Sequence, residues 1–176
     1  MGFLDRNKKV RKNAGTCIHA RCLKKVLCVA LCVGTLVMTG CGEDKEPISA
    51  DTFEDTMEAA GLIINDETES DGDIFGVEQI LVAYSEDGYQ IEYYLFENEA
   101  DATQLYNYVT EDLEINYSDA DVVAKSRVSF EEYGKYTIAV NGEYYVVSRI
   151  GNTLVYATAL EEYKDVTKDL VESLGY

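Results

Sequence analysis

Residues 78–97 read EQILVAYSEDGYQIEYYLFE, two apolar segments separated by a short turn. The segments 78–85 and 89–97 are rich in Ile, Leu, Val, Tyr and Phe, the residue types that favour β-strands. Glu86-Asp87-Gly88 lies between them, and an Asp-Gly pair between two such segments is a strong hairpin signal. This stretch therefore predicts an antiparallel β-hairpin, and the rest of the fold is built around it.

The same pattern recurs on both sides of the hairpin. A short strand is predicted at residues 62–64, and four further strands over 122–130, 135–141, 143–150 and 153–158. Asn141-Gly142 and Gly151-Asn152 separate the last three strands, and both pairs favour tight turns. Residues 135–158 therefore predict an antiparallel meander.

Three helices are predicted from their cap residues and from apolar residues at helical spacing. Ser49 is the expected N-cap of the first helix, which Gly61 ends. Asn98 is the expected N-cap of the second. Thr158 and Glu161 predict a capping box at the start of the third.

The element order is helix, three strands, helix, four strands, helix. Because hairpins dominate, we expect an α+β domain with a mainly antiparallel sheet of about six to seven strands and three helices packed on one face. The order also suggests a degenerate duplication of an α-β-β-β unit.

The N-terminal part has a different composition. Its first 25 residues carry eight of the chain's fifteen basic residues, and thirteen uncharged residues, 26–38, follow. A basic region before a short apolar segment is typical of a bacterial export signal. The segment is shorter than the roughly 20 apolar residues that span a bilayer. Residues 41–176 are therefore expected outside the cytoplasmic membrane.

The signal ends in Met38-Thr39-Gly40-Cys41, which resembles the lipobox of bacterial lipoproteins. In that family the cysteine receives a diacylglyceryl group and becomes the new N-terminus. The resemblance implies that residues 1–40 are a lipoprotein signal peptide and that Cys41 carries acyl chains such as palmitate. Residues 41–48 would be the lipidated cysteine with a polar tether, and 49–176 a single α+β extracytoplasmic domain. The alternative is an ordinary signal peptide that happens to end in cysteine.

The charge that remains after residue 40 excludes one class of partner. Residues 41–176 hold 32 acidic and seven basic residues, a net charge of −25 over 136 residues. Such a surface repels nucleic acid and anionic lipid headgroups. We exclude nucleic acid and expect cations, basic peptides or neutral sugars. The acidity is also explained if it only keeps an exposed domain soluble.

Cysteine and histidine are almost confined to the predicted signal. Cys17, Cys22, Cys28, Cys32 and His19 all precede Cys41, and the mature chain contains no histidine and no second cysteine. Disulfides, Ser-His or Cys-His catalysis and His-metal sites are therefore excluded there. We predict no catalytic residue, and a carboxylate-based cell-wall glycosidase is the least favoured alternative.

Residues 67–78, ETESDGDIFGVE, resemble the calcium loop of EF-hands, which supplies oxygen ligands at alternating positions and ends in Glu. The resemblance implies a calcium site at Glu67, Glu69, Asp71, Asp73 and Glu78. The loop departs from the family in beginning with Glu instead of Asp and in having predicted strands on both sides. A solvated acidic loop is the alternative.

Tyrosine doublets suggest a second kind of site. Neighbouring residues on a strand point to opposite faces, so half of these side chains are predicted on the face away from the helices. That face would carry Tyr94, Phe96, Tyr145 and Val147. An open aromatic face suits sugars, peptides or a partner protein. The alternative is that tyrosine is frequent here because it favours strands.

These observations predict a lipoprotein anchored on the extracytoplasmic face of the cell membrane, similar to small cell-envelope lipoproteins of Gram-positive bacteria. Its partners would be the membrane, through Cys41, and a protein, peptide or cell-wall glycan of unknown identity. It would be a non-catalytic binding or interaction module without a cofactor. A calcium-dependent domain is the alternative.

Overall fold

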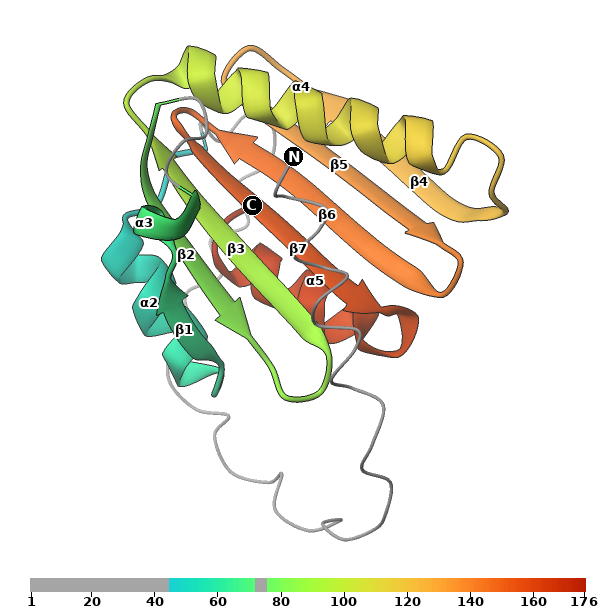
Figure 1. Ribbon diagram of the computed structural model, residues 1–176, viewed down its shortest axis with the longest axis horizontal. Coiled ribbons are helices and arrows are strands. Elements are labelled where there is room, and N and C mark those ends of the chain that lie inside the picture. Colours follow the sequence, from blue (N-terminus) through green and yellow to red (C-terminus); the bar gives the residue numbers. More distant parts are fainter. Residues whose placement is uncertain (1–44, 72–75) are drawn as a thin grey trace, which may run out of the picture. The chain divides into compact units, whose positions relative to one another are not determined.

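Seven strands form one antiparallel sheet in the computed structural model, which describes residues 45–71 and 76–176 (Figure 1). The strands are β1 (Ile63–Asp66), β2 (Val77–Tyr84), β3 (Tyr89–Phe96), β4 (Val122–Ser129), β5 (Tyr133–Val140), β6 (Glu143–Ile150) and β7 (Thr153–Leu160). Their order across the sheet is β1-β2-β3-β7-β6-β5-β4. The predicted α+β class and the antiparallel seven-stranded sheet are confirmed.

The sheet consists of two meanders that meet where β3 pairs with β7. Within each meander consecutive strands are neighbours, and the predicted tight turns join β2 to β3, β5 to β6 and β6 to β7, whereas a longer segment with α3 joins β1 to β2. Asn141 and Gly142 have φ values of 52° and 78°, in the left-handed region that a type I′ hairpin requires at both central positions. The local turn chemistry therefore determines the pairing inside each meander.

The predicted helix starts at Ser49 and Asn98 are confirmed. The three long helices are α2 (Ala50–Ala59), α4 (Glu99–Asn116) and α5 (Lys164–Ser173), and the described residues also form a short α3 (Thr68–Asp71) and a 3-10 turn, η1 (Glu161–Tyr163). The Ser49 side chain accepts a hydrogen bond from the Thr52 N–H at 3.2 Å, and that of Asn98 accepts one from the Asp101 N–H at 3.1 Å. Both satisfy a backbone donor in the first turn of a helix.

The predicted capping box at Thr158 is wrong. β7 continues to Leu160, and Thr158 pairs with Gln90 on β3 and with Tyr145 on β6. A strand with partners on both sides gains two sets of backbone hydrogen bonds, which outweigh the local preference for a helix start. The last helix accordingly begins only after η1.

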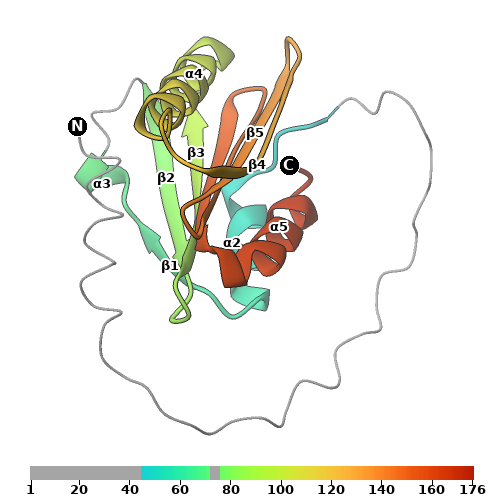
Figure 2. The ribbon, with the colours of Figure 1, turned by 90° about the vertical axis from the view of Figure 1, so that its right-hand side faces the viewer.

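Helices cover both faces of the sheet, so the prediction that all of them pack on one face is wrong. Figure 2 shows α2 and α5 on one side and α4 on the other. Tyr106 of α4 lies so close to Gly134 of β5 that a Cβ on that glycine would come within 2.9 Å of the Tyr106 ring. Tyr93 and Tyr94 are neighbours on β3 and both are fully buried. A central strand that is apolar on both faces needs cover on both.

A buried hydrophobic cluster lies between the sheet and the pair α2 and α5. Phe53 of α2 stacks on Tyr93 with ring centroids 5.3 Å apart. Tyr176, the last residue of the sequence, is buried in the same cluster, and its hydroxyl shares a hydrogen bond with the Thr153 hydroxyl. None of the helices in the described part of the chain is long and apolar enough to cross a membrane.

The folded unit begins at Lys45, four residues before the predicted domain boundary. The predicted signal peptide and Cys41 lie outside the described residues.

Candidate functional site

The predicted aromatic binding face is buried. Tyr94, Phe96, Tyr145 and Val147 have at most 6% of their surface exposed. All four point to the face on which α4 packs. The prediction of an open binding face at these residues is therefore wrong, because it assumed that every helix packs on the opposite side.

This covered face nevertheless contains acidic side chains. Glu92 is only 2% exposed, and its carboxylate accepts hydrogen bonds from Gln90 Nε2 at 2.5 Å and from the Tyr94 hydroxyl. On β6 the Glu143 carboxylate accepts a hydrogen bond from the Tyr145 hydroxyl at 2.6 Å and one from the Tyr117 hydroxyl at 3.2 Å. Hydrogen bonds to a carboxylate are among the stronger ones in proteins. These contacts give both acids a role in the structure of this face.

The predicted calcium loop connects two antiparallel strands, β1 and β2, whereas an EF-hand loop connects two helices. Glu67 accepts a hydrogen bond from the Ser70 hydroxyl at 2.5 Å, which closes the short α3 turn. Glu69 and Glu78 are exposed, while Asp73 and the side chain of Asp71 lie outside the described residues. Across residues 45–71 and 76–176, no group of three or more Asp, Glu, His or Cys side chains is placed to hold a metal ion. Calcium binding stays a prediction, which a melting curve of Glu78→Gln with and without calcium tests.

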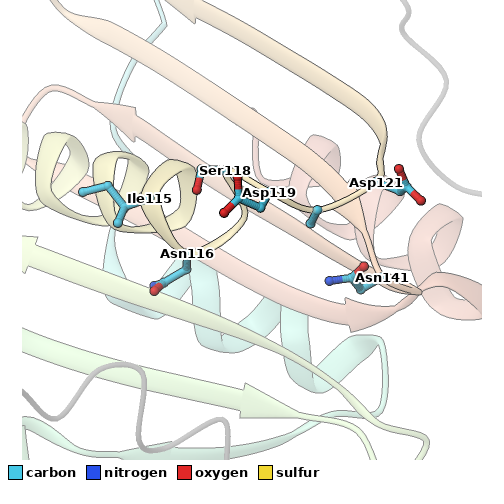
Figure 3. A pocket seen from close by; sticks show the side chains of 7 residues that line it. Ile115, Asn116, Ser118, Asp119, Asp121 and Asn141 are labelled. Atoms are coloured by element: carbon cyan, nitrogen blue, oxygen red, sulfur yellow. The ribbon is translucent and has the colours of Figure 1, made fainter.

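A shallow pocket of about 540 Å³ lies at the C-terminal end of α4 (Figure 3). Its lining comes from the end of α4, the loop that leads to β4 and the β5–β6 turn, and consists of Ile115, Asn116, Ser118, Asp119, Ala120, Asp121 and Asn141. The C-terminal end of a helix carries a partial negative charge, and the last turn of α4 has no basic residue. The pocket is thus suited to cations, but each lining residue is exposed or half-buried, and none of them is held rigidly by burial.

An uncovered part of the sheet lies elsewhere, at the end of the face that carries α2 and α5. We call it the β4–β5 corner, and it consists of Ala124, Ser126, Val128, Phe130, Tyr133, Lys135 and Thr137. Ala124 pairs with Ala139, and Ala139 belongs to the core under α2 and α5, so the corner continues that face. Val128 is 40% exposed and Phe130 is 69% exposed. The corner therefore presents apolar side chains to solvent.

The opposite side of β4 is charged and contacts α4. Lys125 Nζ lies 2.6 Å from a carboxylate oxygen of Glu114 on α4, and the Arg127 guanidinium lies 3.5 Å from it. These contacts hold the pKa of Glu114 below its usual value. β4 is thus an edge strand with one charged side and one apolar side, and its outer edge has no neighbouring strand among the described residues.

The first described residues dock against this corner. Lys45 Nζ lies 4.6 Å from the centroid of the Tyr133 ring and donates a hydrogen bond to the Gly175 carbonyl. On the same ring, Phe130 stacks with centroids 6.4 Å apart and an angle of 17° between the planes. Lys135 Nζ donates to a carbonyl oxygen of Tyr176 at 3.0 Å. The chain therefore enters the fold, and the sequence ends, beside the β4–β5 corner, as Figure 2 also shows.

The environment of the two lysines is partly desolvated, and burial lowers the pKa of both Lys45 and Lys135. Burial likewise raises the pKa of the Tyr133 phenol. Lys45 itself stays exposed, so its contact with the corner lies at the surface of the fold.

Phe130 is predicted from the sequence as the last residue of the strand 122–130, without a functional role. Its signal was the alternation in residues 125–130, where Lys125 and Arg127 occupy one side and Val128 and Phe130 the other. Such alternation at a sheet edge indicates a strand that is charged on one side and apolar on the other.

Comparison with models of protein families and with curated proteins gives no match. Among solved structures, the fold is similar to a GTP binding regulator from Thermotoga maritima, with 18% sequence identity and a TM-score of 0.46 over 72% of this chain and 84% of that chain.

Proposed function

We propose that this chain is an exported lipoprotein that a lipidated Cys41 holds on the outer face of the cell membrane, with Lys45–Tyr176 as a non-catalytic interaction module. The observation that carries the proposal is the lipobox-like Met38-Thr39-Gly40-Cys41 with only three residues between it and the start of the fold at Lys45. A processed lipoprotein would then consist of the lipid, a very short tether and one domain.

The β4–β5 corner supports the role of an interaction module. Its exposed Val128 and Phe130 lie beside the free edge of β4, and such edges bind extended peptides or other surfaces. The high negative charge favours basic or neutral partners over acidic ones. The proposal also includes a degenerate duplication of an α-β-β-β unit as the common origin of the two meanders.

Fractionation of bacteria that express the full chain tests the anchor. We expect the wild-type protein in the membrane fraction, labelled by a clickable palmitate analogue. Cys41→Ala should lose both the label and the membrane association, because no other residue of the mature chain offers a thiol for lipidation. Cys32→Ala is the matched control and should keep both, since Cys32 lies in the part that is removed.

Two outcomes would contradict the proposal. Retention of the label in Cys41→Ala would show that the lipid is elsewhere. Release of the wild-type protein into the medium would favour an ordinary signal peptide.

A further inference from the structure

We propose that the β4–β5 corner is the surface of the domain that contacts the membrane, with the Phe130 ring inserted into the headgroup layer of the bilayer. This inference rests on the proposed lipid anchor at Cys41. It adds an orientation and a second point of membrane contact that the anchor alone does not supply.

The tether between the lipid anchor and the fold is short. Four peptide units separate Cys41 from Lys45 in the sequence. A fully extended chain covers at most about 14 Å over that number of residues. Two acyl chains keep a lipidated cysteine at the bilayer surface. Lys45 of the anchored protein therefore stays within about 14 Å of the headgroup layer.

The contacts of Lys45 determine which end of the domain lies near the headgroup layer. Lys45 is fixed by Tyr133 and by the Gly175 carbonyl, and Phe130 stacks on the same Tyr133 ring. Pro47 packs against the β6–β7 turn, where Gly151 donates a hydrogen bond to the Glu132 carbonyl at 2.9 Å. These contacts place Lys45 directly beside the corner. Lys45 and the exposed Phe130 ring thus lie at the same end of the sheet.

The chemistry of the corner suits a shallow contact with lipid. The Phe130 ring has 69% of its surface exposed to water. When such a ring enters the interfacial region, part of its apolar surface is removed from water, which is favourable. The lipid anchor already holds the domain at the bilayer. The contact therefore does not need to compensate for the entropy that is lost when two free partners associate. Glu131 and Glu132 follow Phe130 and are exposed. These carboxylates remain in water, so the contact stays in the headgroup layer and is weaker on anionic lipid.

Tryptophan fluorescence tests this geometry, because the sequence contains no tryptophan. Phe130→Trp places the only indole at the corner. Leu160→Trp is the matched control, since Leu160 is also exposed, at 45%, and lies at the other end of β7 beside the β2–β3 turn. Full-length protein is processed in bacteria, purified and reconstituted into phosphatidylcholine vesicles whose acyl chains are brominated near the headgroup or left unmodified.

We expect the emission of Phe130→Trp to shift to shorter wavelength. We also expect brominated lipid to quench Phe130→Trp about threefold or more strongly than Leu160→Trp, because about 23 Å of strand separates the two ends. Replacement of half the lipid by phosphatidylglycerol should reduce this quenching. Both variants should melt at the wild-type temperature, since both side chains are exposed.

Flotation of the vesicles separates the two ways of failing. Protein that floats with the vesicles but shows equal, weak quenching in both variants overturns the membrane contact and leaves the lipid anchor intact; the corner is then free for a protein partner. Protein that does not float overturns the anchor, and this inference with it.

Discussion

Strands β3 and β4 have the same length, eight residues, and opposite environments. Six residues of β3 are buried, whereas all eight residues of β4 are exposed. β3 lies between β2 and β7 and is packed by helices on both faces, while β4 has β5 as its single partner strand among the described residues. The comparison shows that the place of a strand in the sheet order determines how much a side chain on it contributes to stability. β3 contributes side chains to the core, whereas β4 contributes side chains to the exposed surface.

The comparison predicts the largest loss of stability for a buried ring on β3. Tyr93→Ala removes a fully buried side chain, its stack on Phe53 and the hydrogen bond of 2.8 Å that its hydroxyl donates to the Ile48 carbonyl. We expect a decrease of about 3–5 kcal/mol in the free energy of unfolding, measured by denaturant titration of residues 43–176. A loss below about 1 kcal/mol would contradict the assigned core.

The sequence predicts much of the fold because strand alternation and turn chemistry are local. The strand over 143–150 is confirmed at both ends, and the caps at Ser49 and Asn98 are confirmed as well. The pairing of β3 with β7 joins residues 58 to 70 positions apart, and no local pattern specifies it. At Thr158 that long-range pairing overrode a local helix signal.

The candidate site was harder to predict for the same reason. The tyrosine doublets correctly indicate side chains on both faces of the sheet, but the sequence does not show which face a helix will cover. α4 buries Tyr94 and Tyr145, and the open surface arises instead at the edge, around Phe130. A long-range contact, that of Lys45 with Tyr133, then places that edge next to the first residues of the folded unit.

The next effect concerns pH and the buried phenol of Tyr176. Burial raises the pKa of Tyr176 from 10.0 to about 12, so the folded state holds this proton more tightly than the unfolded state does. The stabilisation is complete below pH 10 and is lost as the pH rises through about 12. Two pKa units correspond to about 2–3 kcal/mol.

Denaturant titrations between pH 8 and 12, followed together with tyrosinate absorbance, measure this loss. Tyr176→Phe should be less stable at neutral pH by about 1 kcal/mol, because the hydrogen bond to Thr153 is lost. Its stability should then fall less steeply with alkaline pH than that of the wild type. Parallel curves for the two proteins would show that Tyr176 is accessible to solvent.

A matched pair of glutamates sharpens the comparison between buried and exposed charge. Glu92→Gln on β3 replaces one acceptor oxygen by a donor beside Gln90 Nε2 and the Tyr94 hydroxyl. We expect a loss of about 1–3 kcal/mol. Glu114→Gln removes the ion pairs to β4, which are partly exposed, and should cost at most about 1 kcal/mol.

Salt separates the two effects. High salt should remove the loss in Glu114→Gln and leave most of the loss in Glu92→Gln, because ions in solution screen exposed charges more than buried ones. Equal salt dependence in the two variants would contradict the burial of Glu92.

The smallest effect is expected on β4 itself. Val128→Ala should change the free energy of unfolding by less than about 0.5 kcal/mol, because Val128 is 40% exposed on an edge strand. The same substitution at fully buried Val155 on β7 should cost about 2 kcal/mol. If Val128→Ala also loses about 2 kcal/mol, something covers β4 in solution, and a second copy of the chain is the first candidate to examine by sedimentation. If it is neutral, β4 contributes little to the stability of the isolated domain, and its apolar side is available to contact the membrane or a partner.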